Sequence, residues 1–127
     1  MVFSHGNAIT DRVIWLAIDV HRHLGPGLLE SAYEECLCFE LKQSGISHFR
    51  QVTLPVVYKD VRLDCGYRMD IVVEGQLVVE VKAVERVLPI HEAQMLTYLR
   101  LSGHKVGLLM NFNSVVLKDG LRRFVLD

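Results

Sequence analysis

The stretch from Arg68 to Glu85 (RMDIVVEGQLVVEVKAVE) constrains the fold more than any other part of the chain. Two apolar runs flank Glu74 and Gly75, a pair that suits a tight turn. The stretch therefore predicts two neighbouring strands, at about residues 61–73 and 76–83. The second run is apolar at successive positions, which is typical of a central strand covered on both faces.

The rest of the chain alternates between helix and strand signals without repeats or low-complexity tracts. Period-two alternation along 61–73 predicts one buried and one wet face for that strand, and Pro55 indicates an edge or a bulge. Further helices are expected at about 7–24, 29–44 and 90–101, and further strands at 49–58, 105–112 and 115–125. A mixed sheet flanked by helices, in one domain over residues 1–127, is the simplest packing of this order.

Composition limits the classes of function. Half of the 127 residues are hydrophobic, 23% are charged and the net charge is −1. These values predict a globular protein and argue against one that coats nucleic acid by bulk electrostatics. No apolar run approaches the ~20 residues of a membrane span, so no membrane partner is expected.

The cysteines favour a reducing compartment. Cys36, Cys38 and Cys65 cannot all pair within the chain, and their spacing does not suit a zinc site. We therefore expect reduced, buried thiols. Because the chain also shows no export signal, a cytoplasmic location is expected.

Asp70, Glu80 and Lys82 interrupt the apolar runs of the two central strands. Ionised side chains rarely lie inside a sheet unless they are paired or bind something. A loop of residues 74–76 would place Asp70 opposite Glu80, so that all three side chains converge. A two-residue loop would place Asp70 opposite Val79, unless a bulge restores the convergence. The expectation is a three-residue loop or a bulge.

Two converging carboxylates with a nearby backbone carbonyl would suit Mg²⁺ or Mn²⁺, which prefer oxygen ligands and retain waters. Lys82 would reach the same hydration shell, where it could steer or deprotonate a water or stabilise charge on a phosphate. The alternative is a structural ion pair that joins Asp70 or Glu80 to Lys82 or Arg68.

The helix expected at 90–101 carries Gln94 and Tyr98, which lie four residues apart and share a face. An amide and a phenol there could serve a phosphate or a base at the end of the charged strand. The alternative is ordinary packing or capping of a half-buried helix.

An ordered set of residues follows the helix that bears Glu30: Asp70, then Glu80-x-Lys82, then Gln94-x-x-x-Tyr98. This set resembles the PD-(D/E)XK nuclease superfamily, and its last motif resembles the RecB-type branch of that superfamily. The resemblance extends over about residues 9–124 and is more specific to the GxxExxY family. Its blocks are GLLESAY, RQVTLPVVYK, YRMDIVVEGQLVVEVKAVE, HEAQMLTYLRLSGHKVGLLMNF and AIDVHRHLGPG.

This resemblance implies a restriction-endonuclease-like core, α-β-β-β-α-β, of mixed α/β (α+β) class, with an extra N-terminal helix and a C-terminal strand. It implies one or two Mg²⁺ or Mn²⁺ ions and a set of site residues. The metal ligands would be Asp70, Glu80, the Val81 carbonyl and Glu30; the catalytic residues Lys82, Glu80, Asp70, Gln94 and Tyr98; the substrate-binding residues Arg68, Arg86, Gln94 and Tyr98.

The roles of Glu30 and of the histidines stay open. Glu30 could instead be a first-turn glutamate favoured by the helix dipole. RecB-type domains often carry a metal-binding histidine before the aspartate; His21 and His23 precede Asp70, but a surface or core position is expected for both. His91 is expected to cap its helix or lie on the surface.

The leading functional hypothesis is hydrolysis of phosphodiester bonds in DNA or RNA. Tyr67 or Tyr98 could stack on an unpaired base, although core packing is expected for Tyr67. The alternative is a catalytically weak or inactive module that binds nucleic acid or protein, and its apolar surface could form a homo-oligomer. The basic residues considered for holding a nucleic-acid backbone are Arg50, Lys59, Arg68, Lys82 and Arg86.

Overall fold

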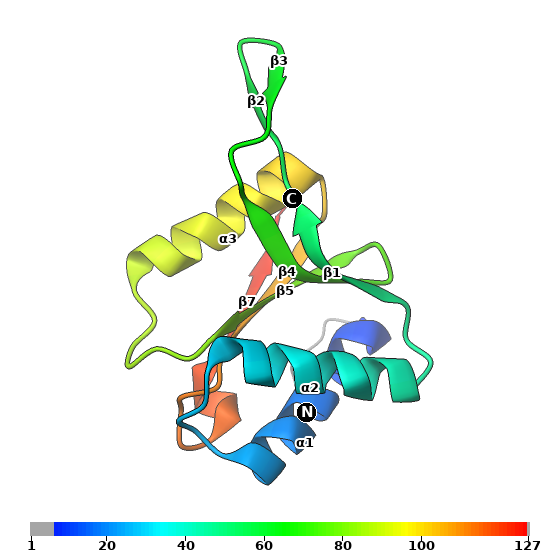
Figure 1. The fold of residues 1–127 in the computed structure, drawn as a ribbon, viewed down its shortest axis with the longest axis vertical. Coiled ribbons are helices and arrows are strands. Elements are labelled where there is room, and N and C mark those ends of the chain that lie inside the picture. The colour runs from blue at the N-terminus through cyan, green and yellow to red at the C-terminus, as the bar shows by residue number, and fades with distance from the viewer. Residues whose placement is uncertain (1–6, 127) are drawn as a thin grey trace.

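The computed structural model describes residues 7–126, and Figure 1 shows its mixed sheet with helices on both faces. The elements in chain order are α1 (Ala8–Leu24), α2 (Glu30–Gln43), β1 (His48–Thr53), β2 (Val56–Tyr58), β3 (Val61–Leu63), β4 (Arg68–Val73), β5 (Leu77–Lys82), α3 (Pro89–Ser102), β6 (Val106–Asn111), the 3₁₀-helix η1 (Leu117–Gly120) and β7 (Leu121–Val125). Within the described residues, no helix combines the length and the apolarity of a membrane span.

Local signals account for the helix boundaries. The Asn7 side chain accepts hydrogen bonds from the N–H groups of Ile9 and Thr10, which caps α1. Helix α3 begins at Pro89, whose fixed φ suits a first helical position, and ends before Gly103 in the left-handed conformation. These helices match the expected ranges closely.

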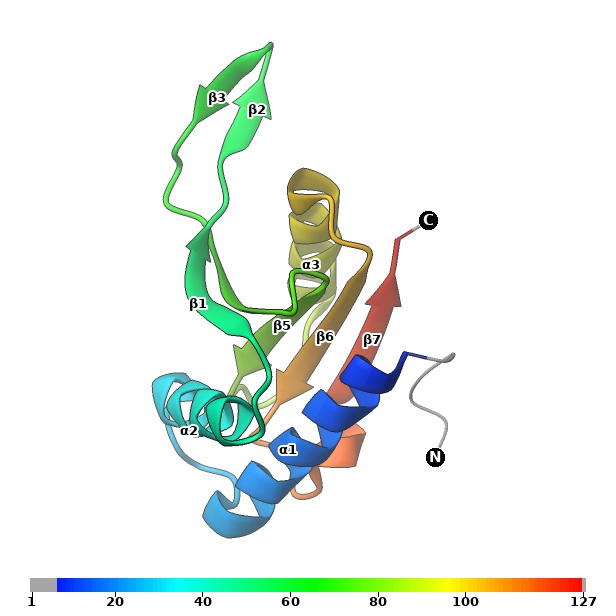
Figure 2. The ribbon, with the colours of Figure 1, turned by 90° about the vertical axis from the view of Figure 1, so that its right-hand side faces the viewer.

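The main sheet has the order β1-β4-β5-β6-β7 (Figure 2). Strand β5 pairs antiparallel with β4 and parallel with β6, and α3 makes the crossover between β5 and β6. The helix and strand order α2-β1-β4-β5-α3-β6 is the expected core, and α1 and β7 are the additions at its two ends. The central position of β5 explains its apolar sequence, since both of its faces are covered.

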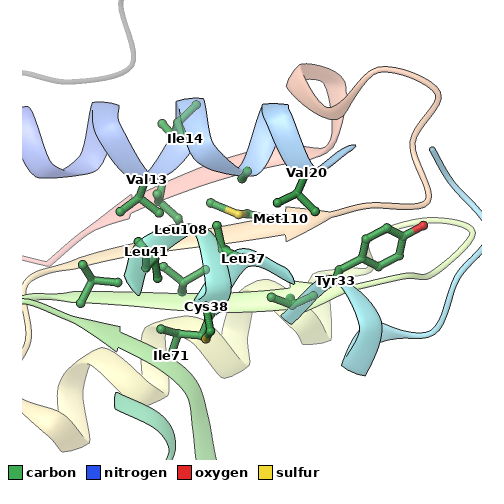
Figure 3. Close-up of a cluster of buried hydrophobic side chains, with 14 of the residues drawn as sticks. Val13, Ile14, Val20, Tyr33, Leu37, Cys38, Leu41, Ile71, Leu108 and Met110 are labelled. Carbon is green, nitrogen blue, oxygen red and sulfur yellow. The ribbon is translucent and has the colours of Figure 1, made fainter. Parts of the chain in front are cut away.

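Two apolar clusters cover the two faces of this sheet. On one face, α1 and α2 pack against the strands, with Ile14, Leu37 and Leu108 among the buried residues (Figure 3). On the other face, α3 contributes Met95 to the second cluster. Helix α3 can approach closely because β6 has Gly107 there; a Cβ at that position would lie 2.5 Å from Met95 Sδ.

The strand expected at 61–73 is not continuous, and this prediction is corrected. The structure divides it into β3 and β4, separated by a turn in which the Asp64 carboxylate accepts the Gly66 N–H and Gly66 has a φ of 80°. The expected strand at 49–58 is likewise divided at Pro55 into β1 and β2. The β2–β3 hairpin therefore forms a separate two-stranded arm that projects from the body (Figures 1 and 2).

The break changes the burial of the segment that precedes β4. The period-two pattern predicts odd positions on a buried face, but Val61, Leu63, Cys65 and Tyr67 are exposed. The prediction of buried thiols is confirmed only for Cys38, since Cys36 is half-buried and Cys65 is exposed. The expectation that Tyr67 packs in the core is wrong. The last strand is shorter than expected as well, because η1 occupies residues 117–120.

Tyr33 holds the loop between α1 and α2. Its ring is fully buried and stacks on Phe112 with ring centroids 4.5 Å apart. Its hydroxyl donates to the Gly25 carbonyl at 2.6 Å and accepts the Leu28 N–H at 3.1 Å. The start of α2, and with it Glu30, is therefore fixed relative to the core.

We predict that Tyr33→Phe lowers the free energy of unfolding by about 1–2 kcal/mol, because two part-buried backbone groups lose their partner while the ring is retained. Urea unfolding followed by circular dichroism would measure this change. Tyr58→Phe is the matched control, since Tyr58 is 59% exposed on the arm. An equal effect of the two substitutions would contradict the assigned role.

Candidate active site

The β4–β5 hairpin brings the two expected carboxylates to opposite positions. The register pairs Val73 with Leu77 and Ile71 with Val79, so residues 74–76 form the loop and Asp70 lies across from Glu80. Glu74 and Gly75 have φ values of 53° and 63°, a turn whose twist suits a hairpin. The expected three-residue loop is therefore confirmed.

Reciprocal hydrogen bonds hold these carboxylates at the point where the β4–β5 ladder ends. The Asp70 N–H donates to Glu80 Oε2 at 2.8 Å, and the Val81 N–H donates to Asp70 Oδ2 at 2.8 Å. At this point a backbone N–H of each strand therefore donates to a carboxylate of the other strand instead of to a backbone carbonyl. Among the described residues, Asp70 Oδ1 accepts one further, long hydrogen bond, from Gln51 Nε2 at 3.5 Å, and Glu80 Oε1 accepts none.

The electrostatic environment of this pair opposes ionisation. Burial raises the pKa of Glu80 to about 8, and the charge of Asp70 acts in the same direction. Burial also raises the pKa of Asp70, against the lowering effect of the Val81 N–H. A cation beside half-buried Asp70 and buried Glu80 would stabilise both carboxylates as anions.

Lys82 follows Glu80 by two residues on β5 and so points to the same face. Its positive charge lowers the pKa of both Asp70 and Glu80, although stronger effects outweigh it. Within residues 7–126, Lys82 takes part in no ion pair, and Arg68 donates to Thr53 Oγ1 at 3.0 Å instead. The structural ion pair that the sequence left open is thus not formed there.

Glu30 lies at the start of α2 and reaches the end of β5. Its Oε2 accepts the Ala83 N–H at 3.0 Å, and its negative charge contributes to the raised pKa of Asp70. The carboxylate therefore borders the site while it binds the backbone beyond Lys82. Its role as a metal ligand stays a prediction.

Helix α3 contributes a polar pair from the opposite side. Gln94 Nε2 donates to the Tyr98 hydroxyl at 2.8 Å, so the two residues share a helix face as expected. Burial raises the pKa of Tyr98, and the charge of Glu80 raises it further. The phenol thus remains protonated at neutral pH and is suited to donate a hydrogen bond.

A second polar cluster, which the sequence did not predict as part of the site, lies behind Asp70. Glu34 of α2 is 6% exposed and pairs with Arg50 at 2.7 Å. Gln51 Nε2 donates to Glu34 Oε1 at 3.1 Å and lies 3.5 Å from Asp70 Oδ1. Arg50 also pairs with Glu35 at 3.1 Å. Two carboxylates of α2 therefore bind its guanidinium, which is not available to a nucleic-acid backbone.

Gln51 has a left-handed φ of 51°, which is unusual for a residue within a strand. The β1–β4 register pairs Arg50 with Ile71 and Val52 with Met69, and the ladder is interrupted between these pairs, where Gln51 faces Asp70. Backbone strain of this kind often marks functional positions. Only the position of Glu34 on the same helix face as Glu30, four residues on, could have indicated this cluster from the sequence.

The histidines occupy structural positions. His21 is 7% exposed, and its Nε2 lies 2.8 Å from the Ser114 carbonyl oxygen. His23 lies on the surface beside Asp19, and His91 Nδ1 accepts the Leu88 N–H at 3.0 Å at the start of α3. The capping role expected for His91 is confirmed.

The donor set of the site is compatible with a hard divalent cation. Asp70 and Glu80 present oxygen ligands, which Mg²⁺ and Mn²⁺ prefer, and such ions commonly bind through one or two carboxylates and complete their shell with waters. Residues 7–126 contain no group of three or more His, Cys, Asp or Glu side chains arranged around one ion. The two carboxylates, rather than a closed protein cage, are therefore the candidate ligands.

Comparison with protein-family models matches residues 7–124 to the PD-(D/E)XK nuclease superfamily. The chain belongs to this superfamily. Neither curated proteins nor solved structures give a match.

For this PD-(D/E)XK site we predict that Glu80→Gln stabilises the metal-free protein increasingly as the pH rises from 5 to 8. The unfolded chain releases the Glu80 proton near pH 4.5, whereas the folded protein holds it until about pH 8. Wild-type stability therefore falls through this window, and the amide removes that loss. Urea unfolding in chelator should give a difference of roughly 1–3 kcal/mol at pH 8 and little at pH 5.

Glu85→Gln, at an exposed loop position, is the control and should show no such pH dependence. A Glu80→Gln effect that does not change with pH would mean that Glu80 is already ionised in the folded protein.

Proposed function

We propose that this chain is a metal-dependent nuclease of the GxxExxY group, which hydrolyses phosphodiester bonds of DNA or RNA with Mg²⁺ or Mn²⁺. The observation that carries the proposal is the pair of opposed carboxylates of half-buried Asp70 and buried Glu80. The amine of Lys82 lies on the same face and forms no ion pair within residues 7–126. If these groups had only a structural role, an ion pair between Lys82 and one of the two carboxylates would be expected. Its absence from the described ion pairs leaves the carboxylates for a cation and the amine for a phosphate.

In this proposal the roles follow from the position of each group. Asp70 Oδ1 and Glu80 Oε1, together with the Val81 carbonyl, would hold the cation, and Glu30 would bind it directly or through water. A bound ion supplies Lewis-acid stabilisation of the phosphate and acidifies a water. Lys82 would orient that water or stabilise the charge that develops on the phosphate oxygens. The protonated Tyr98 phenol, held by Gln94, would donate to the substrate.

Few basic residues remain to hold a nucleic-acid backbone. Arg68 is the first residue of β4, and Arg86 lies in the loop between β5 and α3. Both are exposed, and both are proposed to contact phosphates. Arg50 is removed from this role by Glu34 and Glu35. Binding should therefore be of modest affinity and should weaken as salt rises.

A non-catalytic binding module, alone or as a homo-oligomer, is the second candidate. The β2–β3 arm favours it, because Val57, Tyr58 and Val61 are each more than half exposed there. Apolar surface of this kind is typical of contact sites between proteins. The experiments below distinguish this candidate from the nuclease.

A bound cation is expected to stabilise the folded protein. Mn²⁺ should raise the thermal midpoint of the wild-type protein at pH 8, since an ion that binds only the folded state at 100 times its Kd adds about 2.7 kcal/mol. Asp70→Asn should lose most of this stabilisation, and Asp119→Asn, on η1 and outside the site, should retain it. An equal Mn²⁺ effect in both variants would place the cation elsewhere.

The next prediction concerns catalysis. Lys82→Ala should reduce Mn²⁺-dependent cleavage at least about 100-fold, the scale on which loss of one electrostatic group slows such reactions. The assay would use labelled single-stranded and duplex DNA and RNA, and circular dichroism would check that the fold persists.

Lys118→Ala is the matched control, because Lys118 is an exposed lysine on η1, outside the site. It should cleave at nearly the wild-type rate. A wild-type protein that cleaves none of these substrates, with Mn²⁺ bound, would support the non-catalytic module instead.

A further inference from the structure

A groove of about 550 Å³ lies between α3 and the segment that leads into β4. Asp70 and Glu80 do not line this groove, whose walls are mainly apolar with a few polar side chains. Its lining residues are Val56, Tyr67, Ile90, His91, Ala93, Gln94, Thr97, Tyr98 and Leu101. We call it the tyrosine groove.

The tyrosine groove is continuous with the candidate active site. Gln94 and Tyr98 line the groove, and they are also the hydrogen-bonded pair that α3 presents toward the site. Burial raises the pKa of the Tyr98 phenol, and the charges of Glu80 and Asp70 add to that rise, so this wall of the groove lies within electrostatic reach of the carboxylates. A molecule held at the carboxylates could therefore extend into the groove.

Two aromatic rings in edge contact form part of its wall. Tyr98 is buried, at 5% exposure, whereas Tyr67 is 46% exposed. Their ring centroids lie 6.3 Å apart with the planes at 65°. The sequence pattern predicts a core position for Tyr67, but the turn at Gly66 places it at the surface of the groove, where its ring is available to a flat partner.

We propose that the tyrosine groove binds an unpaired nucleobase, which makes single-stranded nucleic acid the preferred substrate of the proposed nuclease. The inference rests on the proposed function for the position of the backbone. Any base has a π face that can stack on Tyr67, and base–aromatic stacking tolerates different sequences. The apolar side chain of Leu101 can cover a base beside Tyr67 while Gln94 and Thr97, which lie within a turn of Tyr98 on α3, bond to its edges.

A duplex is disfavoured at this position by its own structure. Its bases are stacked and paired, so one of them could enter the groove only after it is unstacked from its neighbours, at a cost of a few kcal/mol. An apolar side chain of another protein could also enter the groove. A nucleic acid is favoured because a phosphate beside Asp70 and Glu80 brings its own neighbouring base to the groove.

The test measures binding rather than cleavage. Fluorescence anisotropy would follow labelled 12-residue oligothymidine, oligouridine and a hairpin duplex of equal length, with Mn²⁺ and with Lys82→Ala in every protein to prevent hydrolysis. Tyr67→Ala should weaken binding of the single strands about tenfold or more, the scale expected for one lost stack, and should leave duplex binding within about twofold. Tyr67→Trp should restore single-strand binding.

Tyr58→Ala is the matched control, since Tyr58 is 59% exposed on the arm and does not line the groove. It should bind the single strands as the parent protein does. An equal loss with single strands and duplex, no loss with Tyr67→Ala, or equal losses for both tyrosines would overturn the proposal. Single strands that do not bind the parent protein would overturn it as well.

Its failure can be distinguished from failure of the proposed function. Binding that depends on Tyr67, together with a wild-type protein that does not cleave, would retain the base subsite and reject the nuclease. Cleavage by wild type that Tyr67→Ala slows equally for single strands and duplex would retain the nuclease and reject the subsite.

Discussion

The exchange of hydrogen bonds between Asp70 and the β5 strand organises the site. The Asp70 N–H binds the Glu80 carboxylate, and the Asp70 carboxylate binds the Val81 N–H, so side chains replace the ladder where β4 and β5 separate. Without this exchange, two buried backbone donors would lack partners, and each would cost stability comparable to a lost hydrogen bond. The same exchange brings half-buried Asp70 and buried Glu80 together, which their raised pKa values reflect.

The surrounding elements maintain this unfavourable arrangement from several sides. Helix α2 supplies Glu30, which binds the backbone after β5, and Glu34, which Arg50 neutralises. The edge strand β1 supplies Gln51, whose left-handed backbone interrupts the β1–β4 ladder opposite Asp70. Strain and buried charge thus concentrate around one side chain, and the packed core beneath it must supply the stability that they remove.

Parts of the fold and the site were predictable because they depend on local rules. The helices have clear caps and stops, and β5 is apolar along its length since it is central, so both were placed nearly correctly. The Asp70–Glu80 register followed from the three-residue loop, because side-chain direction alternates with a fixed period. The break between β3 and β4 was missed, since alternation alone cannot show where a strand leaves the sheet.

The direction of Asp70 depended on the length of the loop before β5, which the structure sets at three residues. The sequence by itself determined the ranges of the helices and of the central strand β5, the shared face of Glu80 and Lys82 on that strand, and the match of residues 7–124 to the superfamily. These properties depend on neighbours along the chain. Only the tertiary structure decided that Arg50 is bound by Glu34, that Gln51 lies beside Asp70, and that Tyr67 opens onto a groove with Tyr98. Each of these contacts joins elements distant in sequence, whose approach is set by the packing of α2 and α3 on the two faces of the sheet.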